Sequence, residues 1–103
     1  MQDMHTRTDR IVVTAMAQAR QGLELEAAEM FQSLVPVSRA EPGCIAYDLY
    51  QSADDDAVFM FYETWDSRQD LDAHLRQPHI QAFMKQAKEV LAGPLQVTLW
   101  KRP

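Results

Sequence analysis

The segment Val58–Trp65 is apolar on both of its faces. Successive side chains of a strand point in opposite directions, so Val58 and Met60 lie on one side of this segment and Phe59 and Phe61 on the other. Neither face can be left in water at low cost, and in a chain of 103 residues helices can cover only one of them. The other face therefore needs a second sheet, which we expect a second copy of the chain to supply.

The rest of the chain predicts three further strands and the helices between them. Short alternating or β-branched runs predict strands at Ile11–Gln18, Ile45–Gln51 and Leu95–Trp100. Apolar residues spaced by three and four positions predict helices over Leu23–Ala40, from the N-cap Ser67 onwards and from Pro78 onwards. The order strand, helix, strand, strand, helix, strand is typical of the ferredoxin-like split βαβ arrangement, an α+β fold with a four-stranded antiparallel sheet and helices on one face.

The length of the chain fits one domain. We expect residues 1–9 to form a flexible N-terminal segment and residues 10–103 to form the single domain. The longest apolar run near the N-terminus, Ile11–Ala17, is too short for a membrane span or a signal-peptide core. The sequence therefore predicts a soluble protein without a membrane partner.

The charge balance and the number of cysteines limit the possible binding partners and the cellular compartment of the protein. Ten basic and fifteen acidic residues give a net charge of −5, and no basic cluster is longer than Lys101–Arg102. This balance argues against a nucleic-acid partner. Cys44 is the only cysteine, so the chain can form neither an internal disulfide nor a thiolate metal set. A reducing cytoplasm is the expected location.

Candidate functional groups lie close together in the second half of the chain. Within 17 residues of otherwise apolar sequence lie an acid, an indole and two imidazoles, those of Glu63, Trp65, His74 and His79. Such groups are usually kept out of a small core unless they are paired or used. The two-residue period places Glu63 and Trp65 on the strand face of Phe61. If helices cover this face, both residues meet His74 across a small apolar pocket.

This pocket suits an electron-rich hydroxyaromatic substrate. His74 is the predicted base, since a histidine with an ordinary pKa near ~6.5 can take a phenolic proton at neutral pH. Glu63 is expected to fix the tautomer of the imidazole, and Trp65 to donate its N–H to a substrate oxygen. The ring of the substrate would be held by aromatic and apolar side chains, those of Phe59, Phe61, Phe83 and Met84, with Tyr47 and His79 as further substrate-binding candidates.

Each of these residues also has a structural interpretation. A lone histidine on an apolar helix stripe is more often a satisfied core residue than a base. Glu63 can equally cap the following helix or pair with an arginine, and Trp65 is more often a core residue than a ligand. His74 and His79 are five positions apart, unlike the i, i+4 pair that places two imidazoles on one helix face. The sequence therefore predicts no metal site.

The order and spacing of several short motifs resemble the antibiotic biosynthesis monooxygenase superfamily, and most of all its small quinol-monooxygenase-type proteins. The motifs are Glu41-Pro42-Gly43-Cys44, Tyr62-Glu63-Thr64-Trp65, the Asp66-Ser67 helix start, Ala73-His74-Leu75, Pro78-His79 and Gly93-Pro94. The resemblance covers Ile11 to Leu99. It implies a ferredoxin-like homodimer whose sheets meet in a dimeric α+β barrel, and an oxygenase that uses O2 without flavin, haem or metal.

The same superfamily contains haem-degrading members, which this chain resembles in Trp65 at a strand end and His74 on the next helix. Those members also carry an asparagine on the first strand, whereas this chain has no asparagine. We therefore predict no flavin, haem or stoichiometric metal, and a monooxygenase that oxidises a quinol or a similar polyhydroxylated aromatic with O2. A dimeric module that binds a small hydrophobic ligand without turning it over, and an isomerase of a small signalling molecule, are the alternatives.

Overall fold

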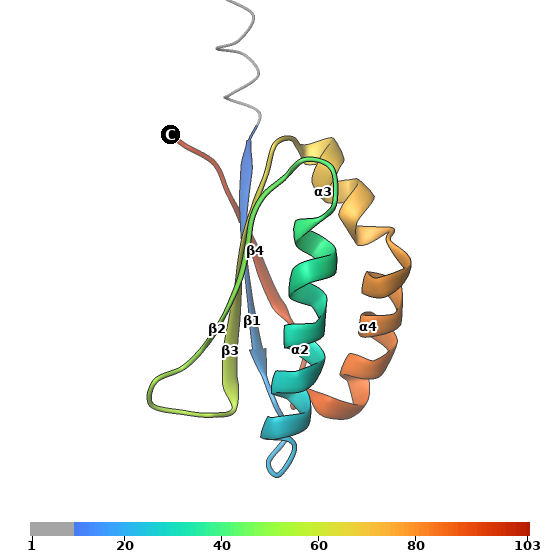
Figure 1. Ribbon diagram of the computed structural model, residues 1–103. Coiled ribbons are helices and arrows are strands. Elements are labelled where there is room, and N and C mark those ends of the chain that lie inside the picture. The colour runs from blue at the N-terminus through green and yellow to red at the C-terminus, as the bar shows by residue number, and fades with distance from the viewer. Residues whose placement is uncertain (1–9) are drawn as a thin grey trace, which may run out of the picture.

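A computed structural model describes residues 10–103, which form one antiparallel sheet with the strand order β2–β3–β1–β4. In chain order the elements are β1 (Ile11–Gln18), α2 (Glu24–Arg39), β2 (Cys44–Gln51), β3 (Val58–Trp65), α3 (Arg68–Leu75), α4 (Pro78–Val90) and β4 (Gln96–Trp100). Within these residues, all three helices cover the same face of the sheet, and the other face carries none (Figure 1). The predicted ferredoxin-like α+β fold is confirmed.

The predicted element boundaries differ little from those of the structure. The last strand begins at Gln96 rather than Leu95, opposite Met16 of β1. The predicted flexible segment at residues 1–9 lies outside the described residues. Within residues 10–103, no helix is long and apolar enough to cross a membrane.

Strand β2 does not alternate regularly along its whole length. A β-bulge between Cys44 and Ala46 inserts Ile45 as an extra residue into β2. Ile45 is therefore exposed, whereas Tyr47 two positions later is buried against the helices. A bulge shifts the two-residue period by one position, so Ile45 and Tyr47 do not share a face of the sheet.

The core lies between the helices and the inner face of the sheet. Phe31 of α2 is fully buried at its centre and meets three phenylalanine rings edge-on. Its ring centroid lies 5.0 Å from that of Phe59, 5.4 Å from that of Phe61 and 5.7 Å from that of Phe83. Edge-to-face pairs of this kind add to the stabilisation that comes from burial alone.

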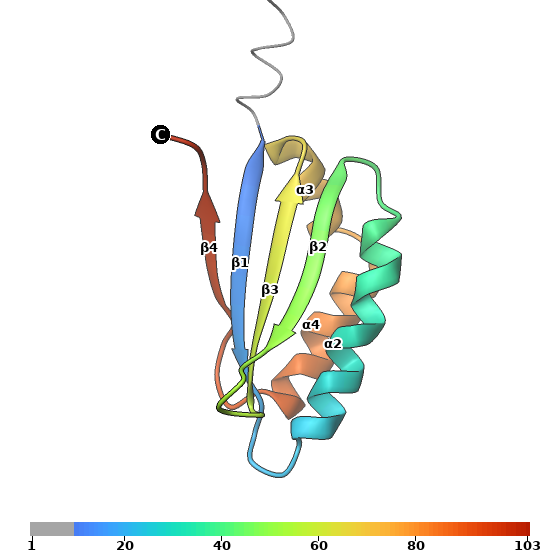
Figure 2. The same ribbon diagram turned by 60° about the vertical axis from the view of Figure 1, so that its left-hand side comes forward.

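The outer face of the sheet carries large apolar side chains that no other part of residues 10–103 covers. Met16, Tyr50, Tyr62 and Trp100 are 39%, 54%, 38% and 53% exposed. The indole of Trp100 donates to Thr14 Oγ1 at 2.8 Å, which fixes β4 beside β1 on this face. Strand β4 forms the edge of the sheet, away from α2 (Figure 2).

The turn between α2 and β2 requires a glycine at position 43. Gly43 has a φ of +80°, and a Cβ atom at this position would overlap the carboxyl group of Asp70. Asp70 lies in the first turn of α3, where its backbone N–H donates to Ser67 Oγ at 3.1 Å, as the predicted N-cap requires. The close approach therefore holds the turn against the start of α3.

We expect Gly43→Ala to lower the free energy of unfolding by about 2–5 kcal/mol in urea denaturation, through the cost of positive φ and of overpacking combined. Gly22→Ala is the matched control, because Gly22 has a φ of +89° but open space around it. Its expected loss is about 1–2 kcal/mol. Equal losses for the two variants would contradict a packing role for the contact with Asp70.

Candidate active site

A cavity of about 160 Å³ lies between the sheet and the helices α3 and α4. Its floor is a row of paired residues that crosses all four strands, Tyr47, Glu63, Val13 and Leu99. Phe61, Leu71, Ile80 and Phe83 supply apolar walls. Leu75, Met84, Val97 and Leu99 also line the cavity and are 38–53% exposed, so the cavity opens toward solvent beside β4.

His74 reaches this cavity from α3. The cap at Ser67 fixes where α3 begins, and Leu71 and His74, three positions apart, then share its buried face. The imidazole is only 3% exposed, and its ring centroid lies 4.5 Å from that of Trp65 and 5.5 Å from that of Tyr47. A titratable ring is thus enclosed by aromatic side chains at the polar corner of the cavity.

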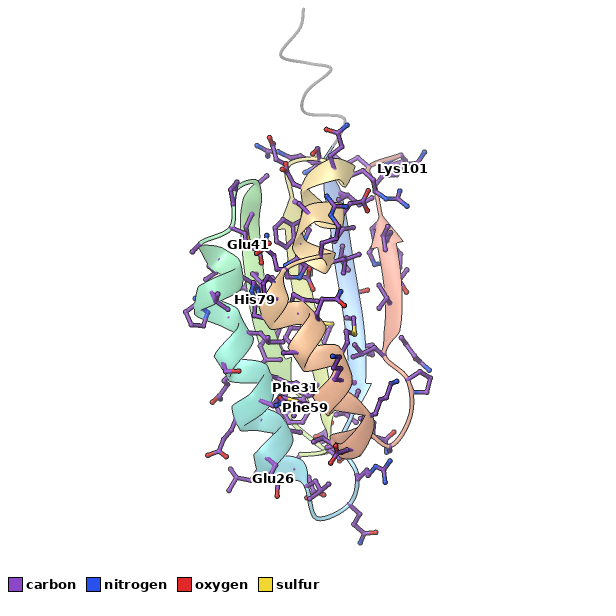
Figure 3. The ribbon with its side chains drawn as sticks, turned by 90° about the vertical axis from the view of Figure 1, so that its right-hand side faces the viewer. Glu26, Phe31, Glu41, Phe59, His79 and Lys101 are labelled. Carbon is purple, nitrogen blue, oxygen red and sulfur yellow. The ribbon has the colours of Figure 1, made fainter. Side chains whose placement is uncertain are left out.

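Glu41 holds the far side of this imidazole. Its Oε2 atom lies 2.8 Å from His74 Nδ1 and 2.9 Å from His79 Nε2. Figure 3 shows Glu41 beyond the end of α2, close to His79 near the start of α4. An ionised carboxylate can only accept hydrogen bonds. When Glu41 is ionised, His74 Nδ1 and His79 Nε2 therefore each carry a proton. His74 Nε2 is then the nitrogen with a free lone pair.

Glu63 faces this free nitrogen. Its Oε1 atom lies 3.9 Å from His74 Nε2, too far for a hydrogen bond, and accepts one from Trp65 Nε1 at 2.9 Å. Burial raises the pKa of the Glu63 carboxyl to about 7, against the opposing effect of the Trp65 bond. Burial also lowers the pKa of His74, against the opposing effect of Glu41. His74 is therefore a neutral acceptor at neutral pH.

Tyr47 supplies the third polar side chain at this corner. Burial, together with the nearby Glu63, raises the pKa of its phenol far above the usual range. The hydroxyl consequently stays protonated at any physiological pH. Tyr47, Glu63 and His74 all line the cavity. A substrate hydroxyl group entering it would therefore meet the Tyr47 hydroxyl and the Glu63 carboxyl group beside the imidazole.

The structure brings most of the predicted site residues together. His74, Glu63, Tyr47, Phe61, Phe83 and Met84 all line the cavity, whereas Phe59, Trp65 and His79 are not part of its lining. Trp65 is fully buried and its N–H is bonded to Glu63, so in this arrangement the N–H does not face a substrate. The catalytic and substrate-binding roles of all these predicted site residues stay predictions.

Glu41 was missed by the sequence interpretation, which assigned the tautomer of His74 to Glu63. In the structure Glu41 makes this contact, across 33 positions of the chain. The only signal was an acid immediately before the Pro42-Gly43 turn, and a turn motif does not reveal which way its side chain points. Glu41, His74 and His79 also place three ligand atoms within 4.8 Å of one another, which the histidine spacing alone did not predict.

Comparisons with known proteins agree with this architecture. The profile of the antibiotic biosynthesis monooxygenase family matches residues 10–86. The protein Rv0793 of Mycobacterium tuberculosis is 34% identical over 92 residues, which are 89% of this chain and 90% of the relative. The protein sll1783 of Synechocystis is 31% identical over 100 residues, which are 97% of this chain and 68% of the relative.

Solved structures extend the likeness to three dimensions. The structure of Rv0793 superposes with a TM-score of 0.86 at 31% identity and covers 91% of this chain and 95% of that one. The structure of PA3566 from Pseudomonas aeruginosa has a TM-score of 0.88 at 26% identity and covers 94% and 97%. Fold and site thus define a ferredoxin-like α+β protein with an acid–base corner between helices and sheet. The chain belongs to the antibiotic biosynthesis monooxygenase family.

Proposed function

We propose that this protein is a cofactor-independent monooxygenase that oxidises a quinol or a related single-ring hydroxyaromatic compound with O2. The observation that carries the proposal is the polar corner of the cavity. There His74 Nδ1 is tied to Glu41, and Nε2 lies 3.9 Å from Glu63 Oε1. A substrate hydroxyl placed between Nε2 and Glu63 would have a proton acceptor on one side and a carboxyl group on the other.

The proposed reaction begins with proton transfer from the substrate hydroxyl to His74 Nε2. The carboxylate of Glu41 stabilises the imidazolium that forms, as a buried acid does for histidine in hydrolytic triads. The electron-rich anion of the substrate then reduces O2 directly. One oxygen atom forms a bond to a ring carbon and the other leaves as water, so a hydroquinone becomes a hydroxyquinone and the atoms balance.

The size of the cavity supports a small substrate. Its volume of about 160 Å³ is close to that of an engineered protein cavity of about 150 Å³ that binds benzene. The walls are formed largely by aliphatic and aromatic side chains, which favour a flat apolar ring. A single ring therefore fits better than a fused three-ring system.

The names of relatives support the reaction class without fixing a substrate. Rv0793 of Mycobacterium tuberculosis and YcnE of Bacillus subtilis are both provisionally named monooxygenases. YcnE is 38% identical over 66 residues, which are 64% of this chain and 70% of the relative. A cytoplasmic location, which the single cysteine favours, is part of the same proposal.

An oxygen electrode tests the proposal. We expect protein-dependent O2 uptake with para-hydroquinone and its methylated forms, above the spontaneous oxidation measured without protein, and little with three-ring hydroxyaromatics. If the rings bind, as seen by quenching of tryptophan fluorescence, but no protein-dependent uptake occurs, the protein is instead a ligand-binding module.

We also propose that a second copy of the chain covers the outer face of the sheet. We expect light scattering to give twice the chain mass of 11.8 kDa, and Tyr62→Lys to give a single chain because it places a charge in the apolar interface. Leu25→Lys is the control, since Leu25 is 74% exposed on α2 and away from that face. A parent protein that elutes as a stable monomer would contradict the proposal.

A further inference from the structure

We infer that Glu41, His74 and His79 form a zinc-binding site, and that a zinc ion bound there removes the lone pair that His74 offers to the substrate. The ligand atoms are Glu41 Oε2, His74 Nδ1 and His79 Nε2, all within 4.8 Å of one another. They come from three separate parts of the chain, and their side chains are 8%, 3% and 20% exposed. The fold therefore brings these three ligand atoms together at a site that is largely shielded from solvent.

The three ligand atoms would rearrange to hold the ion. The two carboxylate–imidazole distances are 2.8 and 2.9 Å. A tetrahedral zinc ion with ligands at ~2.0–2.2 Å holds them about 3.3 Å apart. Each carboxylate–imidazole pair would thus open by a few tenths of an ångström, and the two imidazole nitrogens, which lie within 4.8 Å of each other, would move closer together. Two imidazoles and one carboxylate are a set that holds zinc in proteins, with a water molecule in the fourth position.

The surroundings also fit a metal-bound histidine. A histidine that binds a metal through one nitrogen usually donates the N–H of its other nitrogen to a carboxylate or a carbonyl group. Glu63 is a nearby candidate acceptor, since its Oε1 atom lies 3.9 Å from His74 Nε2 and would have to approach by about 1 Å to accept a hydrogen bond. Glu63 is in turn held by Trp65 Nε1 at 2.9 Å. The imidazole of His74 would thus lie between the carboxylate of Glu63 and the zinc ion.

The expected effect of zinc on the reaction follows from the tautomer of the His74 imidazole. A neutral imidazole that coordinates zinc through Nδ1 must carry its proton on Nε2. Nε2 then has no lone pair with which to accept a proton from a substrate. Glu41 and His79 are not part of the cavity lining, so the ion would lie on the far side of the imidazole ring from the substrate. Zinc should therefore inhibit the reaction rather than take part in it.

Binding is tested first, without any activity measurement. Protein stripped with a chelator is titrated with zinc chloride in competition with a coloured zinc indicator. We expect one zinc ion per chain, and a loss of affinity greater than about 100-fold in His79→Gln, which is more than an outer-shell partner costs. Glu89→Gln is the control, since Glu89 is an exposed acid on α4 outside the cluster, and it should bind as the parent does. Fewer than one ion per chain, or equal losses in both variants, would overturn the site.

The tautomer is tested by nitrogen-15 NMR of the imidazoles. Without zinc, we expect the proton of His74 on Nδ1, and with one equivalent of zinc on Nε2. A His74 signal that keeps its Nδ1 proton at full zinc occupancy would overturn the inference.

The inhibitory effect rests on the proposed function, and its assay is separate. We expect saturating zinc to abolish protein-dependent O2 uptake with para-hydroquinone, which does not chelate zinc as a catechol would. His79→Gln, which keeps His74 and Glu41, should take up O2 at the same rate with and without this concentration of zinc. Unchanged uptake by the zinc-loaded parent would overturn the switch. If the parent never takes up O2, the proposed function fails, while the titration and the NMR measurement still decide the site.

Discussion

His74→Gln should lower kcat for hydroquinone-dependent O2 uptake on the order of 10²–10⁴-fold, with KM changed much less. Glutamine keeps a hydrogen-bonding side chain of similar reach but offers no basic nitrogen. The loss should appear in kcat because proton abstraction matters most in the transition state. The measurement is a kinetic series on an oxygen electrode with zinc removed.

His79→Gln is the matched control for this variant. His79 contacts the same oxygen of Glu41, at 2.9 Å, but does not line the cavity. The control should therefore keep kcat close to that of the parent. If His74→Gln stays folded and consumes O2 at the parent rate, His74 is a packing residue and the ligand-binding alternative is favoured.

Phe31→Ala should lower the free energy of unfolding by about 3–5 kcal/mol, the usual cost of emptying a buried aromatic site. The ring is fully buried and meets three other phenylalanines, so its neighbours cannot all collapse into the space. A domain of this size is stable by only about 5–15 kcal/mol. Urea denaturation at fixed protein concentration measures the loss.

Leu25→Ala on the same helix is the control for Phe31→Ala. Leu25 is 74% exposed, so its truncation should change stability by less than about 0.5 kcal/mol. Similar losses for both variants would contradict a specific role of the aromatic cluster, because alanine is the better helix former at both positions.

The predictions that succeeded depend on local regularities of the chain. The two-residue period of a strand places Phe59, Phe61, Glu63 and Trp65 on one face, and all four are buried under the helices. The cap at Ser67 likewise depends on one side chain and a backbone N–H three residues later. Such patterns span a single element, so they can be read before the fold is known.

The features that the sequence did not predict depend on contacts between distant parts of the chain. Glu41 meets His74 and His79 across 33 and 38 positions, and no local period connects a turn to two helices. The hydrogen bond between Glu63 and Trp65 could be predicted from the sequence, because residues two apart on a strand are neighbours on one face. We assigned the Trp65 N–H to a substrate instead, although a buried acid beside it is the simpler acceptor.

We expect the protein to insert one atom of O2 into a hydroxyaromatic ring held beside His74. Turnover of para-hydroquinone under oxygen-18 gas, with the product trapped at once to prevent exchange with water, tests it directly by mass spectrometry. We predict a hydroxyquinone that carries one labelled oxygen atom, with the label greatly reduced in His74→Gln. Benzoquinone without label, together with hydrogen peroxide, would instead indicate an oxidase and contradict oxygen insertion by this protein.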